Sequence, residues 1–229
     1  HQEKIRYSRQ TIVEQIGEDG QLALRDACVL VVGMGGLGNP VSMYLAAAGI
    51  GKLFLADGDT VDLSNLQRQV LFSPEDINHN KAQQVSERLL KNNPDVEIEV
   101  IDEMLDEESM DYYVEQADVV VDCTDNIEAR YLMNRACVEH QTPLVIGAAT
   151  GFDGQQIVID MRDPQNACYQ CLFPKAEKRP VANCKTHGII WPVLPIIAGM
   201  QALQTIKLIC QIPAQANQLQ LYDGLQNQW

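Results

Sequence analysis

"VLVVGMGGLGNPVSMYLAAAGIGKLFLADGD", residues 29–59, is the stretch around which the chain is organised. It opens with an aliphatic run, Val29–Val32, which is typical of a strand buried on both faces of a parallel sheet. The glycines that follow at once are Gly33, Gly35, Gly36 and Gly38. A helical run from about Asn39 to Ala48 and a second apolar strand, Leu53–Ala56, come next. The order strand, glycine turn, helix, strand predicts an α/β fold built on a parallel sheet.

The glycine turn and the acid after the second strand indicate a nucleotide site. Glycines let the chain turn tightly and let backbone N–H groups approach a phosphate at a helix N-terminus. Asp57, at the end of the second strand, is placed to accept hydrogen bonds from a ribose. The alternative is a tight strand-to-helix connection that binds nothing. The pattern suits both NAD and ATP, and the chain contains no G-x-x-x-x-G-K-[ST] loop of the Walker type.

Composition and charge narrow the class of partner. The 229 residues are 46% hydrophobic and carry a net charge of −14. This balance argues against a nonspecific nucleic-acid surface and against an anionic membrane, and it leaves small molecules and proteins as partners. No segment has the length of a membrane span or the pattern of a signal peptide. The odd count of seven cysteines favours a reducing cytoplasm over a disulfide scaffold.

The remaining elements follow from periodicity and turn signals. Residues 3–27 are expected to form an amphipathic arm of one or two helices. Further helices are predicted near residues 80–90, 107–115, 127–139 and 193–211, and further strands near 97–101, 117–123, 143–147, 155–160 and 219–222. We therefore predict a single domain over residues 1–229. Its Rossmann-like, mostly parallel sheet would be flanked by helices and extended by antiparallel strands.

Polar residues follow two of the predicted strands. The segment 57–83 carries two cations, Arg68 and Lys81, either of which could be simple surface charge. Asp125 follows the strand at 117–123 and would face the same sheet edge as the glycine turn. It could cap the next helix or hold a magnesium ion against phosphates.

Several ordered motifs resemble the ThiF/MoeB/HesA family, the bacterial relatives of ubiquitin-activating enzymes. They are "RYSRQ", "VVGMGGLG", "DGDTVDLSNLQRQ", "NKA", "DCTDN", "CYQC" and "NCKTHG", and the likeness continues to "LYDG" near residue 224. The resemblance implies a homodimeric enzyme that uses ATP and magnesium to adenylate the C-terminal glycine of a ubiquitin-like protein.

The resemblance also implies a role for individual residues. Gly36 and the neighbouring glycines would pass beneath the ATP phosphates, and Asp57 would hold the ribose with Asp59 close by. Asn65, Arg68 and Lys81 would contact the phosphates, Gln69 and Asn126 would border the nucleotide, and Asp125 would bind magnesium. Arg9 would reach into the ATP site of the other subunit. No general base is required, because a C-terminal carboxylate is already ionised at neutral pH.

Three cysteines lie in the Cys-containing region of residues 162–187. Cys168-x-x-Cys171 has the spacing of half a structural zinc site, although two free thiols are the alternative and the sequence reaches Trp229 without a second pair. Cys184 lies between Lys178 and Lys185, which favour the thiolate. The resemblance places there the thiol that some members use in sulfur transfer, and that others do not need. Judged by composition, the segment 176–185 would cover the bound tail.

The function expected first is ATP-dependent adenylation of a thiamine-pathway, ThiS-like sulfur carrier with a C-terminal Gly-Gly. Sulfur would come from a separate donor protein. The same reaction on the molybdopterin carrier, MoaD-like, is the second possibility. An NAD-dependent dehydrogenase and a catalytically silent scaffold are more distant alternatives. Arg68, Lys81 and Asp125 argue against hydride transfer, which needs no triphosphate clamp.

Overall fold

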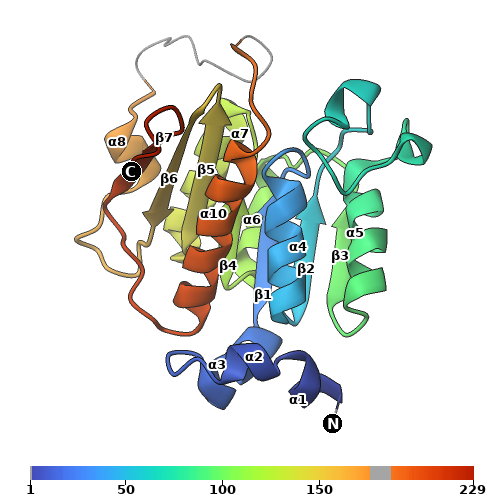
Figure 1. Cartoon of the computed structure of the whole chain (residues 1–229). Helices are drawn as coiled ribbons and strands as arrows, with labels where there is room; N and C mark the ends of the chain where they lie inside the picture. Colours follow the sequence, from blue (N-terminus) through green and yellow to red (C-terminus); the bar gives the residue numbers. More distant parts are fainter. Residues whose placement is uncertain (1, 176–186) are drawn as a thin grey trace.

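The computed structural model describes residues 2–175 and 187–229. Their strands form one seven-stranded sheet in the order β3-β2-β1-β4-β5-β6-β7 (Figure 1). The strands are β1 (Cys28–Val32), β2 (Lys52–Ala56), β3 (Glu97–Ile101), β4 (Val119–Asp122), β5 (Leu144–Thr150), β6 (Asp153–Ile159) and β7 (Leu219–Asp223). The first five strands in the sheet order pair in parallel, whereas β6 pairs antiparallel with β5 and β7. The predicted mostly parallel sheet with an antiparallel extension is therefore confirmed.

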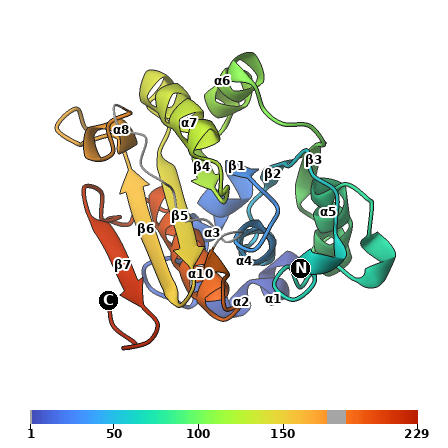
Figure 2. The same cartoon turned by 90° about the horizontal axis from the view of Figure 1, so that it is seen from above.

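Helices cover both faces of this sheet (Figure 2). One face carries α4 (Gly38–Ala48), α5 (Lys81–Asn92) and α10 (Val193–Ile209), and the other carries α6 (Glu107–Gln116), α7 (Ile127–His140) and α8 (Tyr169–Leu172). Each layer has its own apolar core. Along β1, Val29 and Val31 belong to the first core and Leu30 to the second, so the strand is buried on both sides. This explains why the sequence there is continuously aliphatic instead of alternating.

The N-terminal arm contains three short helices, not the one or two predicted. They are α1 (Gln2–Arg6), α2 (Ser8–Thr11) and α3 (Gly17–Asp26), and they lie below the edge at which the parallel strands begin (Figure 1). Tyr7 is buried, and its hydroxyl accepts a hydrogen bond of 2.8 Å from Asn93 Nδ2. Gln10 Nε2 donates to Ala48 O at 2.9 Å. These polar contacts anchor the arm to the last turn of α4 and the residue after α5.

The polar segment between β2 and α5 contains two short 3-10 helices that sequence periodicity does not reveal. They are η1 (Leu63–Asn65) and η2 (Pro74–Asp76). Reciprocal side-chain bonds begin each one, from Asp62 with Asn65 and from Ser73 with Asp76. These capping boxes give the segment a defined path, because they satisfy N–H groups that would otherwise lack partners.

Among the described residues, no helix is long and apolar enough to cross a membrane.

Candidate active site

A cavity of about 550 Å³ lies at the edge where β1, β2 and β4 end. The predicted site residues in its wall come from four separate parts of the chain. The predicted site residues that line it are Gly33, Gly35, Gly36, Asp57, Asp59, Asn65, Arg68, Gln69, Lys81, Asp125 and Asn126. Residues that are up to 93 positions apart in sequence, Gly33 and Asn126, therefore meet at one site.

The glycine turn packs closely against itself and against the residues that follow β4. Gly33 has a φ of +93°, which favours glycine, and a Cβ there would lie 2.8 Å from Cys123 O. A Cβ on Gly38 would lie 1.8 Å from Gly33 O, so only glycine fits at that point. Gly38 was predicted to bind the cofactor, but it does not line the cavity and instead closes the turn.

Asp57 ties the glycine turn to the end of β2. Its Oδ2 accepts a hydrogen bond from Met34 N at 2.7 Å, and its Oδ1 accepts one from Asp59 N at 2.8 Å. Burial raises the pKa of Asp57 above its usual value, although these two N–H groups and the Lys81 charge act in the opposite direction. Each carboxylate oxygen can accept a further bond, so Asp57 can still receive a ribose hydroxyl.

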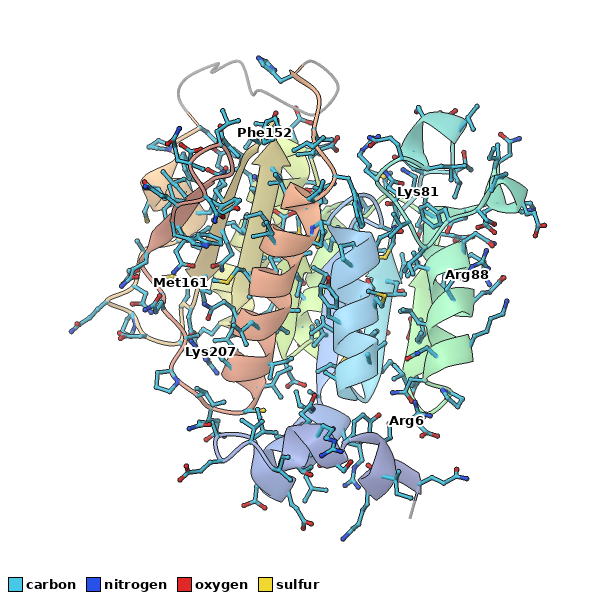
Figure 3. All side chains as sticks on the ribbon, in the orientation of Figure 1. Arg6, Lys81, Arg88, Phe152, Met161 and Lys207 are labelled. Carbon is cyan, nitrogen blue, oxygen red and sulfur yellow. The ribbon has the colours of Figure 1, made fainter. Side chains whose placement is uncertain are left out.

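Lys81 and Arg68 are cations without a counter-ion in the described residues. Lys81 begins α5 and is only 7% exposed, and no described carboxylate lies within 4.0 Å of either cation. Arg68 Nη1 donates to Ser64 O at 2.9 Å, which fixes its direction. Figure 3 shows Lys81 at the end of α5 nearest the loops above the sheet. Because burying an unpaired charge is costly, this arrangement calls for an anionic ligand.

Asn126, not Asp125, caps helix α7. Its Oδ1 accepts hydrogen bonds from Glu128 N at 2.9 Å and from Ala129 N at 3.1 Å. The alternative that Asp125 is the cap is therefore wrong. Asp125 is exposed, and its carboxylate has no hydrogen bond or ion pair in the part of the chain that the structure describes. It remains available to a cation in the cavity.

Two asparagines that support the site were not predicted as site residues. Asn39 is fully buried in α4, where its Nδ2 donates to Met34 O at 2.7 Å and its Oδ1 accepts from Leu71 N at 3.0 Å. Asn80 caps α5 through Gln83 N, and its Nδ2 donates to Asp57 O at 2.8 Å. A polar residue at the start of a strongly apolar helix was the available signal for Asn39. For Asn80 the sequence indicates the start of a helix, but no sequence signal indicates the bond from Asn80 to the end of β2.

The other predicted site residues lie away from this cavity or outside the described residues. Arg9 is exposed on α2, below the opposite edge of the sheet (Figure 1). The Cys168 and Cys171 Sγ atoms lie 3.5 Å apart, where Cys168 precedes α8 and Cys171 belongs to it. No group of three or more described His, Cys, Asp or Glu residues could hold a metal ion. Cys184 and the segment 176–185 lie outside the residues that the structure describes.

Burial and hydrogen bonding act in opposite directions on the Cys168 thiol. Burial raises its pKa, but hydrogen bonds from the Asn134 side chain and from Cys171 outweigh this and leave the pKa below its usual value. The thiolate is the form that binds metals.

Similarity to known proteins covers almost the whole chain. A model of the ThiF family matches residues 7–229. The chain is 46% identical to the sulfur carrier protein ThiS adenylyltransferase of Escherichia coli, over 98% of this chain and 89% of that protein. It is 41% identical to the molybdopterin-synthase adenylyltransferase of Haemophilus influenzae, over 93% of this chain and 86% of that protein.

Longer relatives match as well. The chain is 43% identical to the adenylyltransferase and sulfurtransferase MOCS3 of Anopheles gambiae, but it spans only 51% of that protein's length. A crystal structure of E. coli MccB with ATP has a TM-score of 0.78 and 28% identity, over 91% of this chain and 65% of that one. With a family match over nearly all residues and relatives well above 30% identity, this chain belongs to the ThiF family.

Proposed function

We propose that residues 1–229 form one adenylation domain that transfers AMP from ATP to the C-terminal glycine of a ubiquitin-like, ThiS-type sulfur carrier. One observation carries the proposal: Lys81 and Arg68, which have no counter-ion among the described residues, and Asp125, which has no partner there, line the cavity with the glycine turn. The 46% identity to a ThiS adenylyltransferase supports the choice of carrier.

The residues of the cavity suit this reaction. The carrier's terminal carboxylate attacks the α-phosphorus of ATP, a bond to AMP forms, and pyrophosphate leaves with the electron pair of the broken P–O bond. Lys81 and Arg68 would stabilise the phosphate oxygens, and Asn65 would donate through its amide. Positioning and charge supply most of the catalysis in such transfers, so no side chain has to act as a general base.

Asp125 fits the magnesium ion that ATP brings. Mg²⁺ keeps several waters and takes one or two protein carboxylates together with phosphate oxygens, so a single free carboxylate is enough. When bound, the ion neutralises charge on the leaving pyrophosphate. We expect Asp125→Ala to lose magnesium-dependent pyrophosphate–ATP exchange and Glu128→Gln, on the adjoining helix, to keep it. Exchange at the wild-type rate in Asp125→Ala would remove Asp125 from this role.

Cys168 and Cys171 supply two of the four thiolates that a structural zinc site takes. Zn–S bonds of about 2.3 Å place two sulfurs of a tetrahedron about 3.8 Å apart. The 3.5 Å separation is close to that distance. The described residues offer no third ligand, so the rest of the site would lie outside them. Metal analysis of the purified protein and of Cys171→Ser tests this: zinc bound equally to both would contradict it.

We further propose that Cys184 acts in sulfur transfer after adenylation, with sulfur from a separate donor protein. The support is its place between two lysines, which favour a thiolate. Cys184→Ser should keep carrier-dependent pyrophosphate exchange and lose formation of the carrier thiocarboxylate. Loss of both steps would indicate a structural role.

Carrier-dependent pyrophosphate–ATP exchange tests the main proposal. Exchange should appear with a ThiS-type carrier ending in Gly-Gly and disappear when the last glycine is removed. The 41% identity to a molybdopterin-synthase adenylyltransferase makes a MoaD-type carrier the second candidate, so both carriers belong in the assay. Thermal stabilisation by NADH but not by ATP with Mg²⁺ would indicate a dehydrogenase. Nucleotide binding without exchange on either carrier would favour a scaffold.

A further inference from the structure

A buried ion pair lies directly under the turn that carries Asp125, and the reaction described above leaves it without a role. Asp122 ends β4 and is fully buried, and Arg130 lies on the first turns of α7 with 7% of its surface exposed. Arg130 Nε donates to Asp122 Oδ2 at 2.7 Å. Buried pairs of this kind add little net stability compared with apolar residues, which raises the question of what this one does.

The ion pair binds the backbone N–H, the hydroxyl and the backbone carbonyl of Thr124. Arg130 Nη2 donates to Thr124 O at 3.0 Å, and Asp122 Oδ1 accepts from Thr124 N at 2.9 Å and from its Oγ1 at 2.8 Å. Arg130 Nη2 also donates to Gly147 O at 3.3 Å, on β5. The peptide immediately before Asp125 is therefore fixed between two strands, although the Asp125 side chain makes no bond in the described residues.

Tyr169 of α8 covers the other side of the guanidinium. The Arg130 Cζ lies 5.8 Å from the centre of the Tyr169 ring, which is itself 4% exposed. Asn134, one turn after Arg130 on α7, accepts a hydrogen bond from Tyr169 N at 2.8 Å. The helix beside the cysteine pair thus keeps water away from the ion pair and strengthens it, because charges interact more strongly in a dry environment.

We propose that Arg130 is a positioning residue that fixes the Thr124–Asp125 peptide so that the Asp125 carboxylate meets the magnesium ion of ATP. The proposal rests on the function proposed above. Three of the five N–H donors of the guanidinium are already engaged by Asp122, Thr124 and Gly147. Arg130 also lines the cavity. Its engaged donors connect it to the turn, so we infer that it acts through the turn, in the way that outer residues orient the ligands of a metal.

Arg130→Lys tests this, because an ammonium can still pair with Asp122 but cannot also bridge to Thr124 and Gly147. The readout is the affinity for a non-hydrolysable ATP analogue by calorimetry, with and without Mg²⁺. We expect the gain in affinity from Mg²⁺ to fall about tenfold, as for other residues that orient metal ligands. Affinity without Mg²⁺ should change little. Hydrogen exchange of the Thr124 amide, which donates to Asp122 Oδ1, should become faster.

Arg88→Lys is the matched control. Arg88 Nη2 pairs with Asp76 Oδ2 at 2.7 Å, and Asp76 is also buried, but neither residue lines the cavity. We expect this variant to lose similar thermal stability and to keep the Mg²⁺-dependent gain. Equal Mg²⁺ dependence in the two variants would overturn the proposal.

Tyr169→Leu provides a second route that leaves the ion pair intact if Arg130→Lys does not fold. Removal of the ring should also lower the gain in nucleotide affinity from Mg²⁺, and Tyr169→Phe, which keeps the ring, should keep the gain. An unchanged gain in Tyr169→Leu and Arg130→Lys refutes the inference while leaving the proposed function in place. A wild-type chain without Mg²⁺-dependent ATP binding would refute the proposed function and the inference with it.

Discussion

Lys81 shows how a single residue links burial to ligand chemistry. The structure buries it near two carboxylates, Asp57 and Asp62, neither of which comes within ion-pair distance. Burial keeps the pKa of Asp57 raised in spite of the Lys81 charge, and hydrogen bonds from Ser64 contribute more than that charge to the lowered pKa of Asp62. A charge held in this way costs stability until an anion arrives. Lys81 should therefore strengthen ATP binding and, when no ATP is bound, lower the stability of the fold.

We expect Lys81→Met to lower ATP affinity at least about tenfold, since a direct charge-assisted bond to phosphate is lost. Thermal stability without ATP should not fall, because the buried charge is removed and the alkyl stem remains. Lys91→Met, at the exposed end of the same helix, is the control and should change neither quantity. A Lys81→Met protein that binds ATP normally would show that the ammonium does not face the phosphates.

The raised pKa of Asp57 predicts how the stability of the fold changes with pH. Its pKa is raised in the folded chain, mainly because burial disfavours the charged form. A carboxyl with a raised pKa binds its proton more tightly when folded, so stability falls as pH rises through the window between the unfolded value, about 3.9, and the folded value. Asp57→Asn should remove this decline. Urea unfolding at several pH values across that window measures it, and an unchanged slope in the variant would assign the decline to another group.

At the scale of elements, Asn80 joins the start of α5 to the end of β2. Asn80→Ala should lose about 1 kcal/mol of stability through the missing helix cap. It should also weaken ATP binding, because Lys81 follows directly and Asp57 O loses its donor. Asn80→Ser separates the two effects: its hydroxyl can cap the helix but does not reach Asp57 O. Chemical denaturation and ATP titration of both variants distinguish them, and equal ATP affinity in wild type and Asn80→Ala would deny the link to the site.

The elements also show which features of the fold can be predicted from sequence. The strands β1, β2 and β4 are predictable within two residues because burial on both faces imposes a continuous aliphatic run. Strand β5 extends to Thr150, three residues beyond its predicted end. The sequence cannot predict whether Asp125 or Asn126 caps the helix, because both residue types cap well and the two are adjacent. Asp122 with Arg130 and Asn39 with Leu71 are contacts between elements, and no local pattern reveals them. Spacing could identify the cavity's glycines and cations, but not the polar groups that hold them in place.

At the scale of the whole molecule, Arg9 lies at the end of the sheet opposite the cavity (Figure 1). It cannot take part in its own site in this arrangement. We therefore propose that it acts on the site of a second subunit, as the family resemblance implies. The arm that carries it also exposes apolar side chains suited to an interface, namely Ile5, Ile12, Val13 and Leu22.

Mixed dimers test that proposal. Arg9→Ala and Arg68→Ala should each be inactive alone in pyrophosphate exchange. When the two are mixed and allowed to exchange subunits, a hetero-dimer should regain about one working site, because one of its sites receives both intact arginines. The control is Arg68→Ala alone at the same total protein concentration. If the mixture stays inactive although hetero-dimers form, Arg9 does not serve the neighbouring subunit.

The anchoring of the arm limits how it can be studied by truncation. Tyr7 and Gln10 are held against Asn93 and α4, so cutting the first sixteen residues would remove both side chains, take away these bonds to Asn93 and Ala48, and open the underside of the domain to water. A shortened protein would then lose activity through partial unfolding as readily as through the missing arginine, and proteases would attack it there first. Single-residue replacement on an intact arm is therefore the only clean way to ask what the arm does.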